Sequence, residues 1–299
     1  MNTTINNLVS RNIKLYFKDK GTFFTSLLSP MILLVLFVTF LGSVYENSIL
    51  SNIPEGIQIS NDLVKNFTVS WLFSSLLGVS AVTVAFCSNI IMAQDKVNGA
   101  VNDLLAAPVK KSTLSISYFI ANMITTLVVC FAVTTVGLIY ISTISWYYTV
   151  ADVALIYMNV FLAVLFGCSL SAVVLNFVST QGGVGAVSSL ISSLYGFVCG
   201  AYMPIAQFGD PIRNFISILP GTYSIGLLRT HYLGSVMGEM SKILPSDTID
   251  GIKRAFDVSV YFSDNQVKAW QMYVVVGVTI LVLISTYISI NTFKSKKSK

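Results

Sequence analysis

Residue types that commonly perform catalysis are few in this 299-residue chain, and their spacing matches no catalytic motif. The single histidine, His231, is more typical of a surface or interface residue than of a catalytic base. The sequence contains neither Gly-x-Ser-x-Gly nor His-Glu-x-x-His, the motifs of serine hydrolases and zinc proteases. Because an enzyme site needs titratable groups held together, we predict that the chain is not an enzyme and has no catalytic residue and no metal ligand.

The four cysteines are also poorly placed for chemistry. A disulfide framework or a zinc site needs clustered, accessible cysteines. Here they lie singly within apolar stretches, at Cys87, Cys130, Cys168 and Cys199. We therefore expect them to pack as small hydrophobic side chains.

The elements that carry these residues are apolar segments of membrane-spanning length. Only 10% of the residues are charged and 54% are apolar, whereas a soluble domain has roughly 25% charged residues. A helix crosses the hydrocarbon core with about 20 apolar residues. Six stretches meet this requirement: 22–44, 67–93, 114–141, 153–178, 184–203 and 270–290. The sequence predicts an all-α integral membrane protein, residues 1–299, with six transmembrane helices in one domain.

The distribution of Lys and Arg predicts the orientation. With the N-terminus inside, the inner segments hold 11 basic and three acidic residues, and the outer segments hold seven and ten. The positive-inside rule therefore places both termini in the cytoplasm. The first apolar run is longer than the 7–15 residues of a signal-peptide core, so we expect an uncleaved span.

Residues 1–21 have the pattern of a helix that lies on the membrane surface. At 100° per residue, one sector holds the apolar residues Ile5, Leu8, Val9, Ile13, Leu15, Tyr16 and Phe17. The basic residues Arg11, Lys14 and Lys18 lie opposite. This separation predicts an interfacial helix whose cations lie among lipid headgroups. The alternative is a basic flank that only orients the first span.

The longest internal cytoplasmic loop, residues 95–111, contains a predicted short helix. Asn98 is a candidate N-cap, and Pro108 ends the helix. Leu104 and Leu105 contribute an apolar stripe below the bilayer, which must bury against a soluble partner or against the chain's own bundle. These residues alone leave both alternatives open.

This loop resembles the coupling loop of permeases of type-2 ABC exporters, a family that includes drug, antibiotic, polysaccharide and teichoic acid exporters. Asp95-Lys96 stands where that family usually has Glu-Arg or Glu-Lys, and Ala100 stands where Thr is common. The resemblance implies a coupling helix in a groove of a separate ATPase subunit. The residues that it implicates in coupling are Asp95, Lys96, Asn98, Gly99, Asp103, Leu104, Leu105 and Pro108.

A second match to this family follows the fifth predicted span, in the outer segment 204–268. The matching positions are Gly200, Pro204, Pro211, Pro220, Tyr223 and Arg229. The resemblance implies re-entrant outer helices that close the outer mouth. The segment is apolar but broken by Pro and Gly, which favours a backbone that dips into the membrane and packs against protein. The alternative is an ordinary extracellular loop.

Residues 234–268 form a polar stretch that is longer than in the simplest family members. We expect a helix near 247–256, capped by Asp247 or Thr248. The sequence leaves open whether this stretch is a cap over the pore, a dimer contact or a partner site.

The sequence lacks two features that would allow the chain to energise transport by itself. Ion-coupled carriers place ionisable residues inside their spans, whereas Asp152 lies at the outer edge of the fourth predicted span. The chain also has no Gly-x-x-x-x-Gly-Lys-Ser/Thr loop, so we expect it to bind no cofactor itself. The resemblance implies that ATP and Mg²⁺ belong to the partner ATPase.

Spans two and five line the substrate path in related exporters. The candidate path residues here are Phe73, Phe86, Asn89, Tyr195 and Phe197. An uncharged aromatic path suits a hydrophobic or amphiphilic cargo. The alternative is that each of these residues packs in the core or faces lipid.

The sequence thus predicts the permease half of an ATP-driven exporter in the bacterial plasma membrane. Two copies, as a homodimer, would pair above two ATPase subunits and export a hydrophobic small molecule such as a drug, antibiotic, toxin or lipid-like product. No basic, aromatic face for nucleic acid is present in the sequence. A gradient-driven carrier and a membrane-embedded scaffold or immunity protein are the alternatives.

Overall fold

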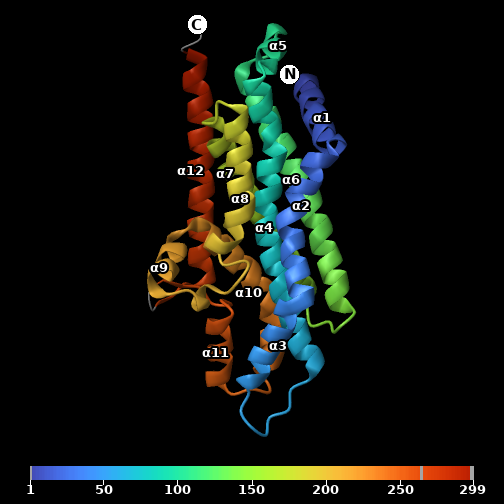
Figure 1. Ribbon diagram of the computed structural model, residues 1–299, viewed down its shortest axis with the longest axis vertical. Helices are drawn as coiled ribbons and strands as arrows, with labels where there is room; N and C mark the ends of the chain where they lie inside the picture. The colour runs from blue at the N-terminus through green and yellow to red at the C-terminus, as the bar shows by residue number, and fades with distance from the viewer. Residues whose placement is uncertain (1, 263–264, 297–299) are drawn as a thin grey trace.

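The computed structural model describes residues 2–262 and 265–296, and these residues are almost entirely helical (Figure 1). Within this part of the chain, five helical segments are long and apolar enough to cross a membrane. They are α2 to α3 (Lys20–Ser51), α4 (Asn61–Val97), α6 (Lys111–Ser142), α7 (Val150–Asn176) and α12 (Ala269–Lys296). The helical membrane-protein class is therefore confirmed. The predicted cytoplasmic residues Lys297 and Lys299 lie outside the described residues.

The first segment is longer than expected because the helix does not stop at the predicted boundary. α2 (Lys20–Leu36) passes through a π-helical turn, η1 (Phe37–Leu41), into α3 (Gly42–Ser51). The stretch after residue 44, which we expected to be an external loop, is therefore partly helical.

The fifth predicted span, 184–203, is represented by α8 (Gln181–Val198). This helix has 18 residues, or about 27 Å at 1.5 Å per residue, slightly less than the roughly 30 Å of hydrocarbon. Glycines and serine pairs also lower its apolar content, and it is not among the five segments above. A sixth span at this position stays a prediction.

Helix α4 is the central element of the bundle. It contacts α2, α6, α7, α8 and α10 (Pro220–Met240). Its large side chains Phe67, Trp71 and Phe86 are fully buried. Small residues allow close approach, as expected in a membrane bundle: a Cβ on Gly167 of α7 would lie 2.3 Å from the Ala81 carbonyl oxygen. A displacement of α4 therefore reaches most of the bundle.

Helix α1 (Asn2–Lys18) folds back beside α6 at the end of the molecule that also holds both termini (Figure 1). Asp19 separates it from α2 and caps α2 by accepting a hydrogen bond from the Thr22 amide. Tyr16 is fully buried, with its hydroxyl 2.7 Å from the Ser26 hydroxyl. Part of the predicted lipid-facing side of α1 therefore packs against protein, while Phe17 is exposed.

Two helices and a short 3-10 turn follow α8 where re-entrant helices are predicted. The turn is η2 (Ile205–Gln207), and the first helix is α9 (Asp210–Ile218). Pro211 and Pro220 lie in the first turns of α9 and α10, where the missing amide hydrogen is not needed. The depth of these helices in a bilayer stays a prediction.

The stretch after α10 contains α11 (Ser246–Ala255) and an antiparallel pair of strands, β1 (Tyr261–Phe262) and β2 (Asn265–Gln266), in which Tyr261 is opposite Gln266. The predicted helix is therefore present. Its predicted cap is wrong, because α11 begins directly after Pro245, which places Asp247 and Thr248 inside the first turn.

Candidate functional site

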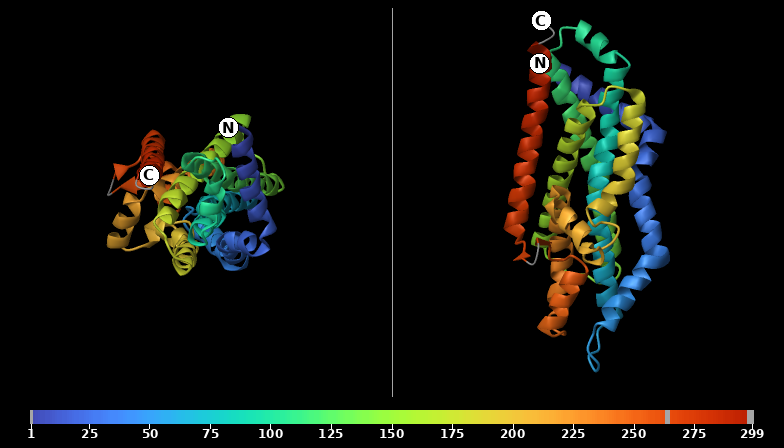
Figure 2. Two further views of the ribbon diagram at one scale, coloured as in Figure 1. Left: turned by 90° about the horizontal axis from the view of Figure 1, so that it is seen from above. Right: turned by 60° about the vertical axis from the view of Figure 1, so that its left-hand side comes forward.

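The predicted coupling helix is present as α5 (Ala100–Ala106), which projects past the ends of the neighbouring helices, near both termini (Figure 2). Every residue of α5 is exposed or half-buried. Asp103 and Pro108 are exposed, whereas Leu104 and Leu105 pack part of their surface against the bundle. The apolar stripe is thus shared between the chain's own core and the outside.

The start of α5 differs from the prediction. Asn98 ends α4 as its C-cap, and Gly99 occupies the N-cap position of α5. Gly99 has φ +82°, a left-handed conformation that glycine adopts without the steric cost of a Cβ. The Asn98 cap is therefore wrong, because the chain reverses at Gly99 rather than at the asparagine.

Asp95 lies at the base of α5 and is engaged within the subunit. Its carboxylate accepts two hydrogen bonds from the Arg11 guanidinium, at 2.8 and 3.2 Å. It also accepts one from the Tyr118 hydroxyl at 2.5 Å. The hydrogen bond to Asp95 raises the pKa of Arg11 above its usual value. Asp95 thus joins α4 to α1 and α6.

Arg11 has an acidic partner within the subunit, whereas its position among lipid headgroups stays a prediction. Its side chain is 34% exposed and pairs with Asp95, whose side chain is 13% exposed. Its neighbour Asn12 is buried as well. The helical projection correctly placed Arg11 on the polar side of α1. At Arg11, this side of the helix faces the end of α4. Lys14 and Lys18 are exposed, as the interfacial helix requires.

Lys96 is engaged on the other side of α4. Its ammonium donates to the backbone carbonyls of Asn176 and Val178, at 2.8 and 2.9 Å. These carbonyls lie at the C-terminus of α7, where a cation is stabilising. Asp95 and Lys96 therefore tie the base of α5 to three other helices.

The outer cluster gathers around Arg229 of α10. Its buried guanidinium donates to the Gly200 carbonyl and, at 3.1 Å, to the Ser75 hydroxyl. It lies 4.7 Å above the Trp71 ring, a cation–π distance. Gly200 has φ +69°, and a Cβ there would collide with Ile205. Two predicted gate residues, Gly200 and Arg229, are thus brought into contact.

The remaining predicted gate residues shape the helices nearby. Tyr223 is buried, and its hydroxyl donates to the Ser217 carbonyl at 2.6 Å, which ties α10 to α9. Pro204 is buried in the turn before η2. These residues hold the turn between α8 and α10 in one shape.

Asp257 is a member of this buried cluster that the sequence analysis missed. Its carboxylate accepts hydrogen bonds from the backbone amides of Ile205 and Ala206 and pairs with Arg229 at 3.4 Å. Burial raises the pKa of Asp257 to about 6, and the charge of Arg229 opposes this rise. A single acid between Phe256 and Val258 was the available signal.

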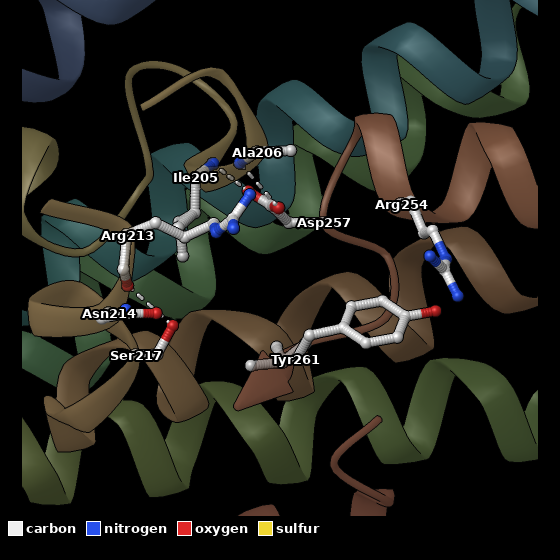
Figure 3. A pocket seen from close by; sticks show the side chains of 9 residues that line it. Ile205, Ala206, Arg213, Asn214, Ser217, Arg254, Asp257 and Tyr261 are labelled. Carbon is white, nitrogen blue, oxygen red and sulfur yellow. Dashed lines mark hydrogen bonds between the residues drawn. The ribbon is translucent and has the colours of Figure 1, made fainter. Parts of the chain in front are cut away.

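A cavity of about 210 Å³ opens beside this pair. Figure 3 shows Ile205, Ala206 and Asp257 gathered at one end of it. Two arginines also line it, and both are engaged: Arg213 pairs with Asp210 at 2.6 Å, and Arg254 lies 5.0 Å above the Tyr261 ring. The cavity therefore lies where residues 254–261 meet α9 and the turn after α8.

The predicted substrate-path residues do not share one surface. Phe86 and Asn89 are buried, and the Asn89 amide donates to the Ser171 hydroxyl at 3.4 Å. Tyr195 is buried in the same cluster as Phe86, whereas Phe197 is 49% exposed. Phe73 lines a different region. One copy of the chain does not assemble these five residues into a path.

The groove beside Phe73 has a volume of about 470 Å³ and is lined mainly by apolar residues. It lies between the α2 to α3 segment, α4 and α6. Its lining includes Leu34, Phe37, Val69, Phe73, Val136 and Tyr140. Gly137 of α6 contacts the Phe73 ring, and a Cβ at Gly137 would lie 2.6 Å from it. The glycine therefore sets the depth of the groove.

The single histidine and the four cysteines have packing roles. The His231 Nε2 atom lies 3.0 Å from the Tyr273 hydroxyl, between α10 and α12. All four cysteines are free and buried.

A family model described as ABC-2 type transporter matches residues 3–233. No curated protein matches the chain. The matched residues include Arg11, Asp95, α5 and Arg229, whereas Asp257 lies beyond them.

Proposed function

The chain belongs to the ABC-2 type transporter family, and on this premise we propose that it is the membrane-spanning permease half of an ATP-driven exporter in the bacterial plasma membrane. The family implies an ABC ATPase as the partner. We place ATP and Mg²⁺ on that partner. In the proposed assembly, two copies of the chain pair above two ATPase subunits, with the termini and α5 in the cytoplasm.

The observation that carries the proposal is the position of α5. It projects from the bundle with its residues exposed or half-buried, so a partner can reach it. Asn98, Asp103 and Pro108 are exposed, and we assign them to direct contact with the ATPase together with Gly99, Leu104 and Leu105. We assign Asp95 and Lys96 a positioning role, because their charges are satisfied within the subunit.

The contacts at the base of α5 offer a route for force. Movement of α5 when the ATPase subunits close would displace the end of α4. The contacts of Asp95 and Lys96 would transmit this displacement to α1, α6 and α7. Helix α4 has 37 residues, about 55 Å at 1.5 Å per residue. Near its outer part, Ser75 and Trp71 contact Arg229. One continuous helix therefore links the coupling end to the outer mouth.

The cargo we propose is a hydrophobic or amphiphilic small molecule such as a drug, antibiotic, toxin or lipid-like product, moved out of the cell. The groove beside Phe73 supports this proposal, since its volume of about 470 Å³ falls within the range of about 300–1,000 Å³ for small-molecule sites. Its lining is mainly apolar and also includes Glu46 and Lys65, which suits an amphiphilic ligand.

We assign the pairing of two copies to an exposed stripe on α8. Leu190, Leu194 and Phe197 are 57%, 51% and 49% exposed and share one helix face by their spacing. This stripe would meet the same stripe of the second copy or line the path between the copies.

The proposal is tested by export from membrane vesicles that contain the chain with or without an ABC ATPase from the same organism. We expect release of a hydrophobic dye that depends on both the ATPase and ATP. Export of the dye by the chain without any ATPase would overturn the proposal.

A further inference from the structure

We propose that residues 241–262 form a clamp over the outer mouth, and that Asp257 is the positioning residue through which this clamp holds the mouth closed. The inference rests on the proposed function, because it assigns the clamp to a transport route. It also concerns a part of the chain beyond the residues matched by the family model, which end at residue 233.

The first step is that one carboxylate joins three separate elements. Asp257 accepts hydrogen bonds from the amides of Ile205 and Ala206, in the turn between α8 and α9. The same carboxylate pairs with Arg229 of α10. Arg229 in turn donates to Gly200 at the start of that turn. Asp257 thus holds the turn at Ile205 and Ala206, and Arg229 holds it at Gly200.

The second step is that the clamp is anchored on α4. The Trp71 indole N–H donates to the carbonyl of Phe256, the residue before Asp257, at 2.9 Å. The Phe256 ring meets Phe67 of α4 and Tyr45 of α3, with ring centroids 5.3 and 5.5 Å apart. Phe256 therefore fixes the clamp to the helix that also carries α5 at its other end.

The third step is that the conformation and the burial of Asp257 are energetically unfavourable. Asp257 has φ +51°, a left-handed conformation that is unfavourable for a residue with a Cβ. Its ion pair with Arg229 is almost completely buried, with side chains 10% and 2% exposed, and burial of such pairs is weak evidence for stability. Unusual backbone conformations persist where surrounding contacts determine them and often mark functional sites. A closing device accounts for this arrangement better than general stabilisation.

The consequence is a specific order of events. The turn from Gly200 to Gln207 cannot move away from α4 while Asp257 holds the Ile205 and Ala206 amides. A displacement of α4 shifts Trp71 and therefore both Phe256 and Arg229. The clamp would release the turn when α4 moves.

The test is hydrogen exchange of the backbone amides in residues 200–209, measured on the full chain in lipid nanodiscs without nucleotide. We expect Asp257→Ala, which removes both acceptor oxygens, to accelerate exchange of these amides by roughly tenfold, equivalent to about 1.4 kcal/mol. The matched control is Asp247→Ala, at an exposed acid in α11 of the same clamp, which should leave exchange unchanged. Unaltered exchange in folded Asp257→Ala would overturn the proposal.

A double variant keeps the test decisive if the single variant does not fold. Arg229→Met with Asp257→Ala removes both charges, so no unpaired buried charge remains. The Ile205 and Ala206 amides still lose their acceptor, and we expect the same acceleration. If these amides remain as protected as in the unmodified chain, Asp257 does not hold the turn.

A dye-leakage measurement distinguishes whether Asp257 closes the mouth or only stabilises the turn. In liposomes that contain the chain and its ATPase but no ATP, Asp257→Ala should allow a small uncharged dye to leak, while Asp247→Ala should not. A tight membrane together with faster exchange would show that Asp257 shapes the turn without closing the mouth, which would overturn the clamp. If the chain binds no ATPase, the proposed function fails, but the exchange result still decides whether Asp257 holds the turn.

Discussion

Arg11 and Asp95 lie 84 positions apart in the chain and meet in a two-bond ion pair, at 2.8 and 3.2 Å, at the base of α5. The pair joins the N-terminal helix to the end of α4. Lys96, the next residue, holds the end of α7. The base of the proposed ATPase contact is therefore rigidly connected to the helices that must move.

Replacing Arg11 tests this connection. Because the pair is partly exposed, Arg11→Gln should lower the free energy of unfolding by only about 1 kcal/mol or less. Cargo-stimulated ATP hydrolysis should fall several-fold, since α1 no longer follows α4, while ATPase affinity is retained. Lys14→Gln, an exposed position on the same helix, is the control. Equal stimulation in both variants would contradict the connection.

The left-handed conformation of Gly99 makes a second prediction. Gly99→Ala should strain the backbone by about 1–2 kcal/mol and change the direction of α5, which would weaken binding of the ATPase. Gly56 is a matched control, because its φ is +91° and, like Gly99, it has open space where a Cβ would lie among the described residues. Gly56→Ala should cost similar stability and leave ATPase affinity unchanged. Titration of the ATPase with each variant measures the difference.

Gly137→Ala should make the groove beside Phe73 shallower. A Cβ would lie 2.6 Å from the Phe73 ring, so the ring must move toward the groove, at an overpacking cost of about 1–3 kcal/mol. We expect a weaker apparent affinity for a hydrophobic dye with unchanged ATPase binding. Gly234→Ala, where a Cβ meets open space in the described structure, should change neither. Dye titration of ATP hydrolysis decides whether the groove binds cargo.

The raised pKa of Asp257 predicts the pH dependence of the clamp. In the closed mouth its pKa is about 6, whereas an exposed aspartate has about 3.8. Below pH 6 the closed state therefore binds more protons than an open state that exposes Asp257. Acidification should favour closure, and the contribution of this group to the stability of the closed state should decrease as pH rises from about 4 to 6.

The groups facing Asp257 are Arg229 of α10 and Tyr45 of α3. Export in vesicles should slow when the outer pH falls from 7 to 5, and Asp257→Asn should lose this component. Faster export at pH 5 in the unmodified chain would contradict the sign.

The sequence predicted best what depends on local patterns. Apolar runs located five long helices, and the motif in residues 95–111 located α5. The pairing of Arg11 with Asp95 was missed because the two residues are distant in the chain. The predicted Asn98 cap was wrong because the chain turns at Gly99.

Asp257 could not be found from sequence patterns because its partners lie 28 and 52 positions away. A lone acid in a polar stretch gives no periodic signal, and its burial results from contacts with Arg229 and with the turn that holds Ile205 and Ala206. The role of the predicted path residues stays a prediction, because aromatic spacing along α4 and α8 does not reveal which face the neighbouring helices cover.

The most direct test of the central claim is the affinity of the full chain for its ABC ATPase. Leu104→Glu introduces a charge at a half-buried apolar position of α5. We expect the dissociation constant to increase by at least roughly tenfold, while Leu50→Glu, at an exposed apolar position of α3, leaves it unchanged. Equal affinity of unmodified chain and Leu104→Glu would contradict the claim that α5 couples this permease to its ATPase.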